Sequence, residues 1–298
     1  MSLLVVMTHR EAQTGALSET AAAALASAKQ QGFGAPETVD WEGGHVWWFN
    51  TPANPGRSGA LVREAGRWAA CTGSVHWQGL TGEPLLRKLL RDFDRPQDMP
   101  LRDFSGSFAM VFSVGQATWL FNDAVGIHKI YSCLDGRVHS SSLLLCRHLL
   151  RQPKVDRLRA QEYVLLGGTH ALQTPIAGVT VLEPTQGLEL VSGQKATLYP
   201  PQAWRIAARL RSADEAVDTL SDMIAAEFAG MRQAFGGPIG MALSGGFDSR
   251  LILAALDHHK VSPRLYVYGA KDMDDVQIAT AKAADLEVNR GIVVTDDM

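Results

Sequence analysis

Residues 241–250 read Met241-Ala-Leu-Ser-Gly-Gly-Phe-Asp-Ser-Arg250, and this stretch predicts more about the fold than any other part of the chain. A short apolar strand is followed by a Ser-Gly-Gly turn and then by Asp-Ser, which opens a helix. A turn of this kind points backbone N–H groups and a helix N-terminus at one place, where they can hold a phosphate group. We therefore predict an anion-binding loop between the strand and the helix.

The residue types of this loop suit a nucleotide phosphate. Gly245 and Gly246 allow the main chain to approach an anion closely, and the hydroxyls of Ser244 and Ser249 can donate to phosphate oxygens. Asp248 would repel phosphate directly, but its carboxylate can hold a magnesium ion that bridges to it. The alternative is a plain glycine turn in which Ser244 or Asp248 caps the helix. The combination of all five residues favours the nucleotide.

The sequence around the loop alternates between helix and strand. Ser212-Ala-Asp-Glu215 is a capping box, and apolar residues follow it at helical spacing as far as Phe235. The elements predicted after it are the strands Ile239–Leu243, Arg264–Tyr268 and Arg290–Thr295 and the helices Asp248–His258 and Asp274–Leu286. Such alternation predicts a parallel sheet, and open sheets of this type bind ligands at the carboxyl ends of their strands.

The pattern differs before residue 200, where short strands dominate. The predicted strands are Val46–Phe49, Trp68–Trp77, Ser107–Val114, Thr118–Asn122, Arg137–Ser141, Gly187–Val191 and Ala196–Tyr199. The predicted helices are Glu83–Arg91, Ser142–Leu150 and an Ala-rich helix at Thr20–Ala28, which Ser18 would cap and Gly32 would end. Many short strands with few helices predict packed antiparallel sheets. We thus expect an α+β domain over residues 1–200 and an α/β domain over residues 201–298.

Composition excludes several classes of function. The 298 residues carry a formal net charge of -3, which gives no electrostatic footprint for nucleic acid or for an anionic membrane. The three cysteines are scattered, so neither a disulfide framework nor a zinc cluster is indicated. None of the nine histidines shows metal-binding spacing. The apolar run at the N-terminus is too short for a signal peptide, and we expect a cytoplasmic protein.

The order Ser-Gly-Gly-x-Asp-Ser lacks the lysine of the common P-loop. It resembles instead the pyrophosphate loop of the N-type ATP pyrophosphatases. This resemblance implies an enzyme that cleaves ATP between the α- and β-phosphates, so that an acid is adenylated and pyrophosphate leaves.

Three segments of the first half extend the resemblance to the asparagine synthetase family. The family's glutaminase domain carries Gly-x-Phe-Ala, a segment like Arg-Asp-x-x-Gly-x-Lys-x-x-Tyr and a strand end like Ala-Ser-Glu. Here Gly106–Ala109, Asn122–Tyr131 and Ser140–Ser142 are similar to them and stand in the same order. The resemblance covers about residues 70–290. It implies a glutaminase-like αββα sandwich of the N-terminal-nucleophile-hydrolase type, followed by the first part of an ATP pyrophosphatase domain.

The glutaminase segment departs from the family pattern. The family's nucleophile is an N-terminal cysteine, whereas position 2 is Ser2 and the nearest cysteine is Cys71. Thr72–Trp77 stands where the family has Asn-Gly-Glu-x-Tyr-Asn, and it lacks the first asparagine. Because the polar groups that fix glutamine are lost, we predict a domain without glutaminase activity. The cysteine-less β-lactam synthetases and lasso-peptide cyclases show the same pattern. A further alternative is that Ser2 is a working nucleophile, as in other N-terminal-nucleophile hydrolases.

The family also continues well past the end of this sequence, through a second Ser-Gly-x-Gly-x-Asp motif and a late catalytic lysine. The resemblance therefore implies a fragment, a truncated gene product or half of a split enzyme. A short parallel sheet would leave an edge at which further strands should pair.

The function predicted from these features is an ATP-dependent, amide-forming ligase with ATP and Mg²⁺ as cofactors. It would adenylate a carboxylate, either aspartate or a specialised acid, for attack by an amine or ammonia. The residues expected at the nucleotide are Ser244, Gly245, Gly246, Asp248 and Ser249 on the phosphates, Asp248 on magnesium, and Leu243 and Tyr268 beside the adenine, the last two by resemblance. The alternative is a non-catalytic or partner-dependent nucleotide-binding subunit.

Expected partners are a small-molecule or peptide carboxylate and a second subunit or missing C-terminal half, whereas nucleic acid and membrane are not expected. A homodimer is left open.

Three further interpretations concern side chains outside the loop. We expect Asp272, Asp274 and Asp275 to cap the following helix rather than bind metal. Asp123 and Lys129 should form a surface ion pair. The residues expected in the core are Trp47, Trp48, Trp68 and Trp77.

Overall fold

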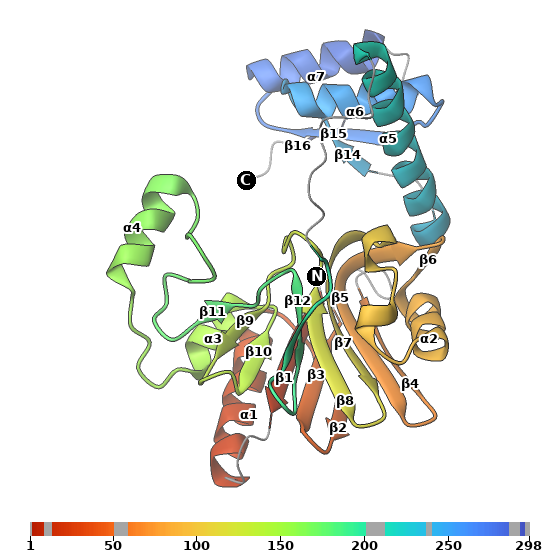
Figure 1. The fold of residues 1–298 in the computed structure, drawn as a ribbon. Coiled ribbons are helices and arrows are strands. Elements are labelled where there is room, and N and C mark those ends of the chain that lie inside the picture. Colours follow the sequence, from red (N-terminus) through yellow and green to blue (C-terminus); the bar gives the residue numbers. More distant parts are fainter. Residues whose placement is uncertain are drawn as a thin grey trace. The chain divides into compact units, whose positions relative to one another are not determined.

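The computed structural model describes residues 2–8, 14–50, 59–200, 212–236, 240–285 and 293–295. The chain divides into two compact units, Met1–Pro201 (unit 1) and Gln202–Met298 (unit 2). Figure 1 shows antiparallel sheets with helices in unit 1 and a smaller sheet with helices in unit 2.

The described residues of unit 1 form two sheets in which every pairing is antiparallel. The first has the order β11-β9-β10-β1-β3-β2. Its strands are β1 (Leu3–Thr8), β2 (Glu37–Trp41), β3 (Gly44–Phe49), β9 (Tyr131–Cys133), β10 (Val138–Ser140) and β11 (Thr180–Val181). All six residues of β1 are buried, because this central strand is covered on both faces. Its continuous apolar run follows from that position.

The second sheet has the order β13-β12-β8-β7-β5-β4, with β6 paired to β5. Its strands are β4 (Gly59–Glu64), β5 (Arg67–Trp77), β6 (Leu80–Thr81), β7 (Ser105–Val114), β8 (Ala117–Asn122), β12 (Gln186–Glu189) and β13 (Lys195–Thr197). The register places Thr72, Ala109 and Asn122 side by side across β5, β7 and β8. Residues paired in this way point to the same face of a sheet.

Helices cover the outer face of each sheet. One buried cluster joins Leu4, Val46 and Trp48 of the first sheet to Leu61 and Leu120 of the second, so the two sheets pack face to face. The helices of unit 1 are α1 (Thr14–Gln30), α2 (Gly82–Asp92), α3 (Leu143–Leu149) and α4 (Arg157–Leu166), with short 3₁₀ turns at Pro96–Asp98 and Leu101–Asp103. α1 and α3 pack on the first sheet, and α2 packs on the second.

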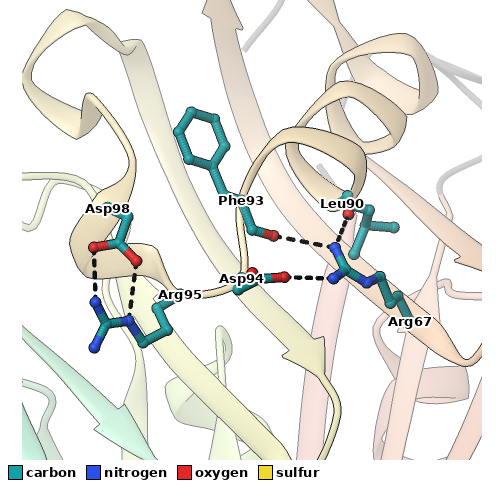
Figure 2. A network of polar contacts seen from close by, with 6 residues as sticks. All are labelled: Arg67, Leu90, Phe93, Asp94, Arg95 and Asp98. Carbon is teal, nitrogen blue, oxygen red and sulfur yellow. Dashed lines mark hydrogen bonds and ion pairs between the residues drawn. The ribbon is translucent and has the colours of Figure 1, made fainter.

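A polar network ties the end of α2 to the second sheet (Figure 2). The guanidinium of Arg67, at the start of β5, donates to the carbonyls of Leu90 and Phe93 and pairs with Asp94. Arg95 holds Asp98 through two nitrogen–oxygen contacts of 2.9 and 3.0 Å. Because the last carbonyls of a helix lack intrahelical partners, the contacts of Arg67 stabilise the C-terminus of α2.

Unit 2 contains a parallel sheet in the order β14-β15-β16. Its elements are α5 (Ala213–Phe235), β14 (Gly240–Ala242), α6 (Phe247–His258), β15 (Arg264–Tyr268), α7 (Asp274–Asp285) and β16 (Val293–Thr295). Its core joins Leu243, Leu253, Val267 and Val276. Ser212 caps α5 as predicted, since its hydroxyl accepts a 3.1 Å hydrogen bond from the Glu215 N–H.

Most predicted elements are confirmed, with differences at their ends. Ser18 does not cap the Ala-rich helix, because α1 begins at Thr14 and Ser18 lies inside it. The elements that were not predicted are the helix α4, none of whose residues is buried, and the strands β1, β2, β4, β6, β9 and β11. Arg290, Leu286 and Ile239 lie outside the described residues. The four tryptophans expected in the core, Trp47, Trp48, Trp68 and Trp77, are each at most 9% exposed.

Among the helices that the structure describes, none combines the length and the apolar character that a membrane crossing requires.

Candidate functional site

The predicted phosphate loop connects β14 to α6. Ala242 pairs with Tyr266 in parallel register, and the Leu243 N–H extends this pairing with a 2.9 Å hydrogen bond to the Tyr266 carbonyl. Leu243 is 1% exposed and anchors the start of the loop in the core of unit 2. The loop therefore emerges at the carboxyl end of a parallel strand, which is where ligands bind in sheets of this kind.

The hydroxyls of Ser244 and Ser249 form hydrogen bonds within the turn. The Oγ atoms of Ser244 and Ser249 lie 3.1 Å apart, and the Ser244 N–H donates to Ser249 Oγ at 3.2 Å. The Gly246 N–H donates to Ser244 Oγ, also at 3.1 Å. The structure thus brings together the four residues Ser244, Gly245, Gly246 and Ser249. The Ser249 hydroxyl donates to the carbonyls of Ser244 and Gly246 at 3.2 and 3.3 Å, so it must give up these bonds before it can donate to a ligand oxygen, whereas the Ser244 hydroxyl can rotate toward one.

Gly245 lies against the first turn of α7. Its N–H donates to the Asp275 carboxylate at 2.9 Å. A Cβ on Gly245 would lie 2.5 Å from Asp275 Oδ1 and 3.1 Å from Ile278 Cδ1, so any larger residue would push the Asp275 carboxylate away from the loop. Asp275 lies in the first turn of α7, where an acidic side chain favours the helix N-terminus, and its carboxylate also accepts a hydrogen bond from a loop 30 residues earlier in the chain.

The N-terminus of α6 is open to a ligand. Its N-cap is Gly246, which has no side chain and makes no side-chain cap bond. The first N–H groups of a helix have no intrahelical acceptor, so Phe247, Asp248 and Ser249 present three donors. The Phe247 side chain is 72% exposed. This combination of donors and helix dipole can hold a polyphosphate.

Asp248 is the carboxylate of the loop that could hold magnesium. It is exposed in the first turn of α6. Within the described ranges, no group of three or more His, Cys, Asp or Glu side chains could form a metal site. A magnesium ion usually keeps several waters and binds one or two carboxylates together with substrate phosphates. The residues present fit a metal that arrives with the nucleotide.

Tyr268 ends the neighbouring strand β15 at the same edge of the sheet. Its ring is 60% exposed and meets Tyr266 edge-on, with the centroids 5.5 Å apart. An exposed ring beside a phosphate loop offers apolar surface for a base, which is compatible with the adenine position expected from the resemblance.

Ser2, the alternative nucleophile of unit 1, is buried against Thr72. Its Oγ lies 2.8 Å from Thr72 Oγ1, while Thr72 Oγ1 donates to the Ser2 carbonyl at 2.6 Å. Since the Thr72 hydroxyl has a single proton, Ser2 must donate the bond between the two oxygens. A serine nucleophile needs a base to take its proton, and here the proton points to a neutral hydroxyl.

The turn that follows β8 holds a second group of buried polar atoms in unit 1. The Asp123 carboxylate is 4% exposed and accepts hydrogen bonds of 2.9 and 2.8 Å from the N–H groups of Ile127 and His128. The expected surface ion pair with Lys129 is therefore wrong, because Asp123 is buried by its own turn. Asn122 Oδ1 and His128 Nε2 are buried and have no hydrogen-bond partner in the described part of the chain.

Burial lowers the pKa of the His128 imidazole, and the nearby Asp123 carboxylate opposes this effect only in part. The unfolded chain then binds a proton more readily than unit 1 does. We expect unit 1 to have its full stability above the ordinary histidine pKa of about 6.5 and to lose part of it as the pH falls below that value. Urea unfolding at pH 7.5 and 5.5 should show a smaller loss for His128→Gln. An equal loss in both proteins would contradict the burial of a neutral imidazole.

A cleft of 1230 Å³ opens elsewhere in unit 1, at the hairpin ends of its strands. Its lining includes Trp41, Arg67, Trp119 and Glu189, and none of the residues predicted for the nucleotide. The cleft is therefore separate from the chemistry that the sequence predicts.

Comparison with protein-family models and with curated proteins found no match. Several solved structures are similar to this chain, including the following two. One is the glutamine phosphoribosylpyrophosphate amidotransferase from B. subtilis complexed with ADP and GMP, with a TM-score of 0.38, 10% identity and coverage of 99% of this chain and 91% of that chain. The other is the allosteric regulatory enzyme of purine biosynthesis, with a TM-score of 0.36, 11% identity and coverage of 99% and 80%. Similarity at this level carries no argument about activity.

Proposed function

We propose that the loop Ser244–Arg250 binds the polyphosphate of ATP with Mg²⁺ and that the chain serves an ATP-dependent, amide-forming ligase reaction. A carboxylate oxygen attacks the α-phosphorus of ATP and pyrophosphate leaves. An amine or ammonia then attacks the acyl adenylate, and AMP leaves. The observation that carries this proposal is the uncapped N-terminus of α6, which stands beside two serine hydroxyls at the carboxyl end of β14.

The hydrogen-bond donors of the loop suit a reaction in which pyrophosphate is the leaving group. Its amides and hydroxyls donate to an anion, and these donors stabilise charge that develops as the bond to the α-phosphorus breaks. A magnesium ion supplies further charge neutralisation when bound, and Asp248 would hold it. No step requires a protein nucleophile.

The second candidate is a partner-dependent subunit that binds nucleotide without turning it over. It is favoured by the composition of the site itself, because neither the loop nor Tyr268 supplies a group that would hold the acid or the amine. Pyrophosphate release from ATP in the presence of candidate acids, aspartate among them, separates the two. Release supports the ligase, whereas ATP binding without release supports the subunit.

Replacement of Asp248 tests the proposed metal role. We expect Asp248→Ala to weaken the binding of ATP with Mg²⁺ about tenfold, while metal-free ATP binds at least as well as before. Asp257→Ala is the matched control, because it removes the same charge from the last turn of the same helix. Calorimetry with and without magnesium measures both. If the Asp248→Ala protein binds ATP with magnesium as tightly as its parent does, Asp248 does not hold the metal.

We further propose that unit 1 is a glutaminase-like scaffold without glutaminase activity, since the Ser2 hydroxyl is buried and donates to Thr72. Incubation with glutamine should release no more glutamate from the parent than from Ser2→Ala. Glutamate release that depends on Ser2 would support the alternative that unit 1 is an amidohydrolase with an N-terminal serine nucleophile.

A further inference from the structure

We propose that Asp275 acts as an internal anion at the phosphate loop and that its side chain must leave Gly245 when polyphosphate binds. The inference rests on the proposed function, and it adds to it a contact within the protein that lowers the affinity for the ligand.

The geometry of the contact is that of an anion bound by the loop. The Gly245 N–H donates to Asp275 Oδ1 at 2.9 Å, so a negatively charged oxygen already lies on a backbone amide of the cradle. The approach is so close that a Cβ at position 245 would lie 2.5 Å from Asp275 Oδ1 and would displace it. The neighbouring Gly246 N–H donates instead to a neutral acceptor, Ser244 Oγ. Ser244 can rotate and donate to phosphate, whereas an ionised carboxylate can only accept and repel.

The backbone of Asp275 is fixed while its side chain is free to turn. The next residue, Val276, is 3% exposed and packs in the core of unit 2, which holds the first turn of α7 in place. The Asp275 side chain is exposed, so a change of rotamer into solvent needs no rearrangement of the core. The switch is therefore one side chain rather than a moving helix.

Binding of metal-free pyrophosphate tests this role. We expect Asp275→Asn to bind pyrophosphate about fivefold more tightly than the parent, because the amide keeps an acceptor for Gly245 but removes the negative charge. Asp274→Asn is the matched control. It removes the same charge from the adjacent residue of α7, and no hydrogen bond joins Asp274 to the loop in the residues described. It should change the affinity less than twofold. Thermal unfolding of all three proteins checks that the fold is kept.

The outcomes separate this inference from the function on which it rests. Tighter binding by Asp275→Asn alone supports the internal anion. Equal or weaker binding by Asp275→Asn, with measurable binding by the parent, overturns it and leaves the phosphate loop standing. An equal gain in both variants shows an effect of net charge and also overturns it. Binding by none of the three proteins contradicts the proposed function itself.

Discussion

Replacement of Phe247 by proline should weaken the binding of ATP about 10- to 150-fold, which corresponds to the loss of one hydrogen bond of about 1.5–3 kcal/mol to a charged group. Phe247 is the first residue of α6, and proline there removes its backbone N–H together with the exposed ring. That N–H has no intrahelical acceptor, so the helix itself loses no bond.

The fold should tolerate this change. Proline favours the first position of a helix, and it restricts the preceding residue to extended backbone. Gly246 already has φ -69° and ψ 155°, which satisfies that restriction. The side chain that is lost is 72% exposed, so little buried area disappears with it.

Phe247→Ala is the control, because it removes the same ring and keeps the N–H. We expect this variant to bind ATP like the parent, and both variants to unfold at nearly the parent's temperature. Calorimetric titration with ATP gives the affinities. Equal affinity of the proline and alanine variants would show that this amide does not contact the phosphates.

Phe121→Ala should lower the free energy of unfolding of unit 1 by about 3–5 kcal/mol. Phe121 is fully buried on the outer face of the second sheet, and its ring meets Phe108 edge-on at a centroid distance of 6.5 Å. Its truncation loses apolar burial and an aromatic contact and leaves a cavity in a cluster that includes Leu86 and Leu89 of α2.

Urea unfolding followed by tryptophan fluorescence measures this effect, since every tryptophan except Trp204 lies in unit 1. Tyr163→Ala on α4 is the control, because its ring is 56% exposed and should cost less than about 1 kcal/mol. Similar losses for the two variants would contradict the packing of α2 on the second sheet.

The elements of unit 2 could be predicted from the sequence because their signals are local. The capping box at Ser212, the Ser-Gly-Gly turn and the apolar spacing each lie within a few residues, and the strand Arg264–Tyr268 appears with its predicted bounds. The loop residues could be proposed as a phosphate site for the same reason. Their chemistry is encoded in one continuous stretch.

Contacts between distant residues could not be predicted in this way. Ser2 and Thr72 are separated by 70 positions, and only the packing of the two sheets makes one hydroxyl the acceptor of the other. Gly245 and Asp275 are separated by 30 positions, and an acidic residue near a helix start reads as a cap unless the neighbouring loop is known. Asp123 was misread because a carboxylate can be buried when its own turn supplies two N–H donors.

A crystal structure of the protein with a non-hydrolysable ATP analogue and magnesium tests the central claim most directly. The account predicts phosphate oxygens within hydrogen-bonding distance of the N–H groups of Phe247, Asp248 and Ser249, with the Asp275 carboxylate turned away from Gly245. A saturated crystal in which the loop keeps its Gly245–Asp275 bond and the nucleotide lies elsewhere would contradict it.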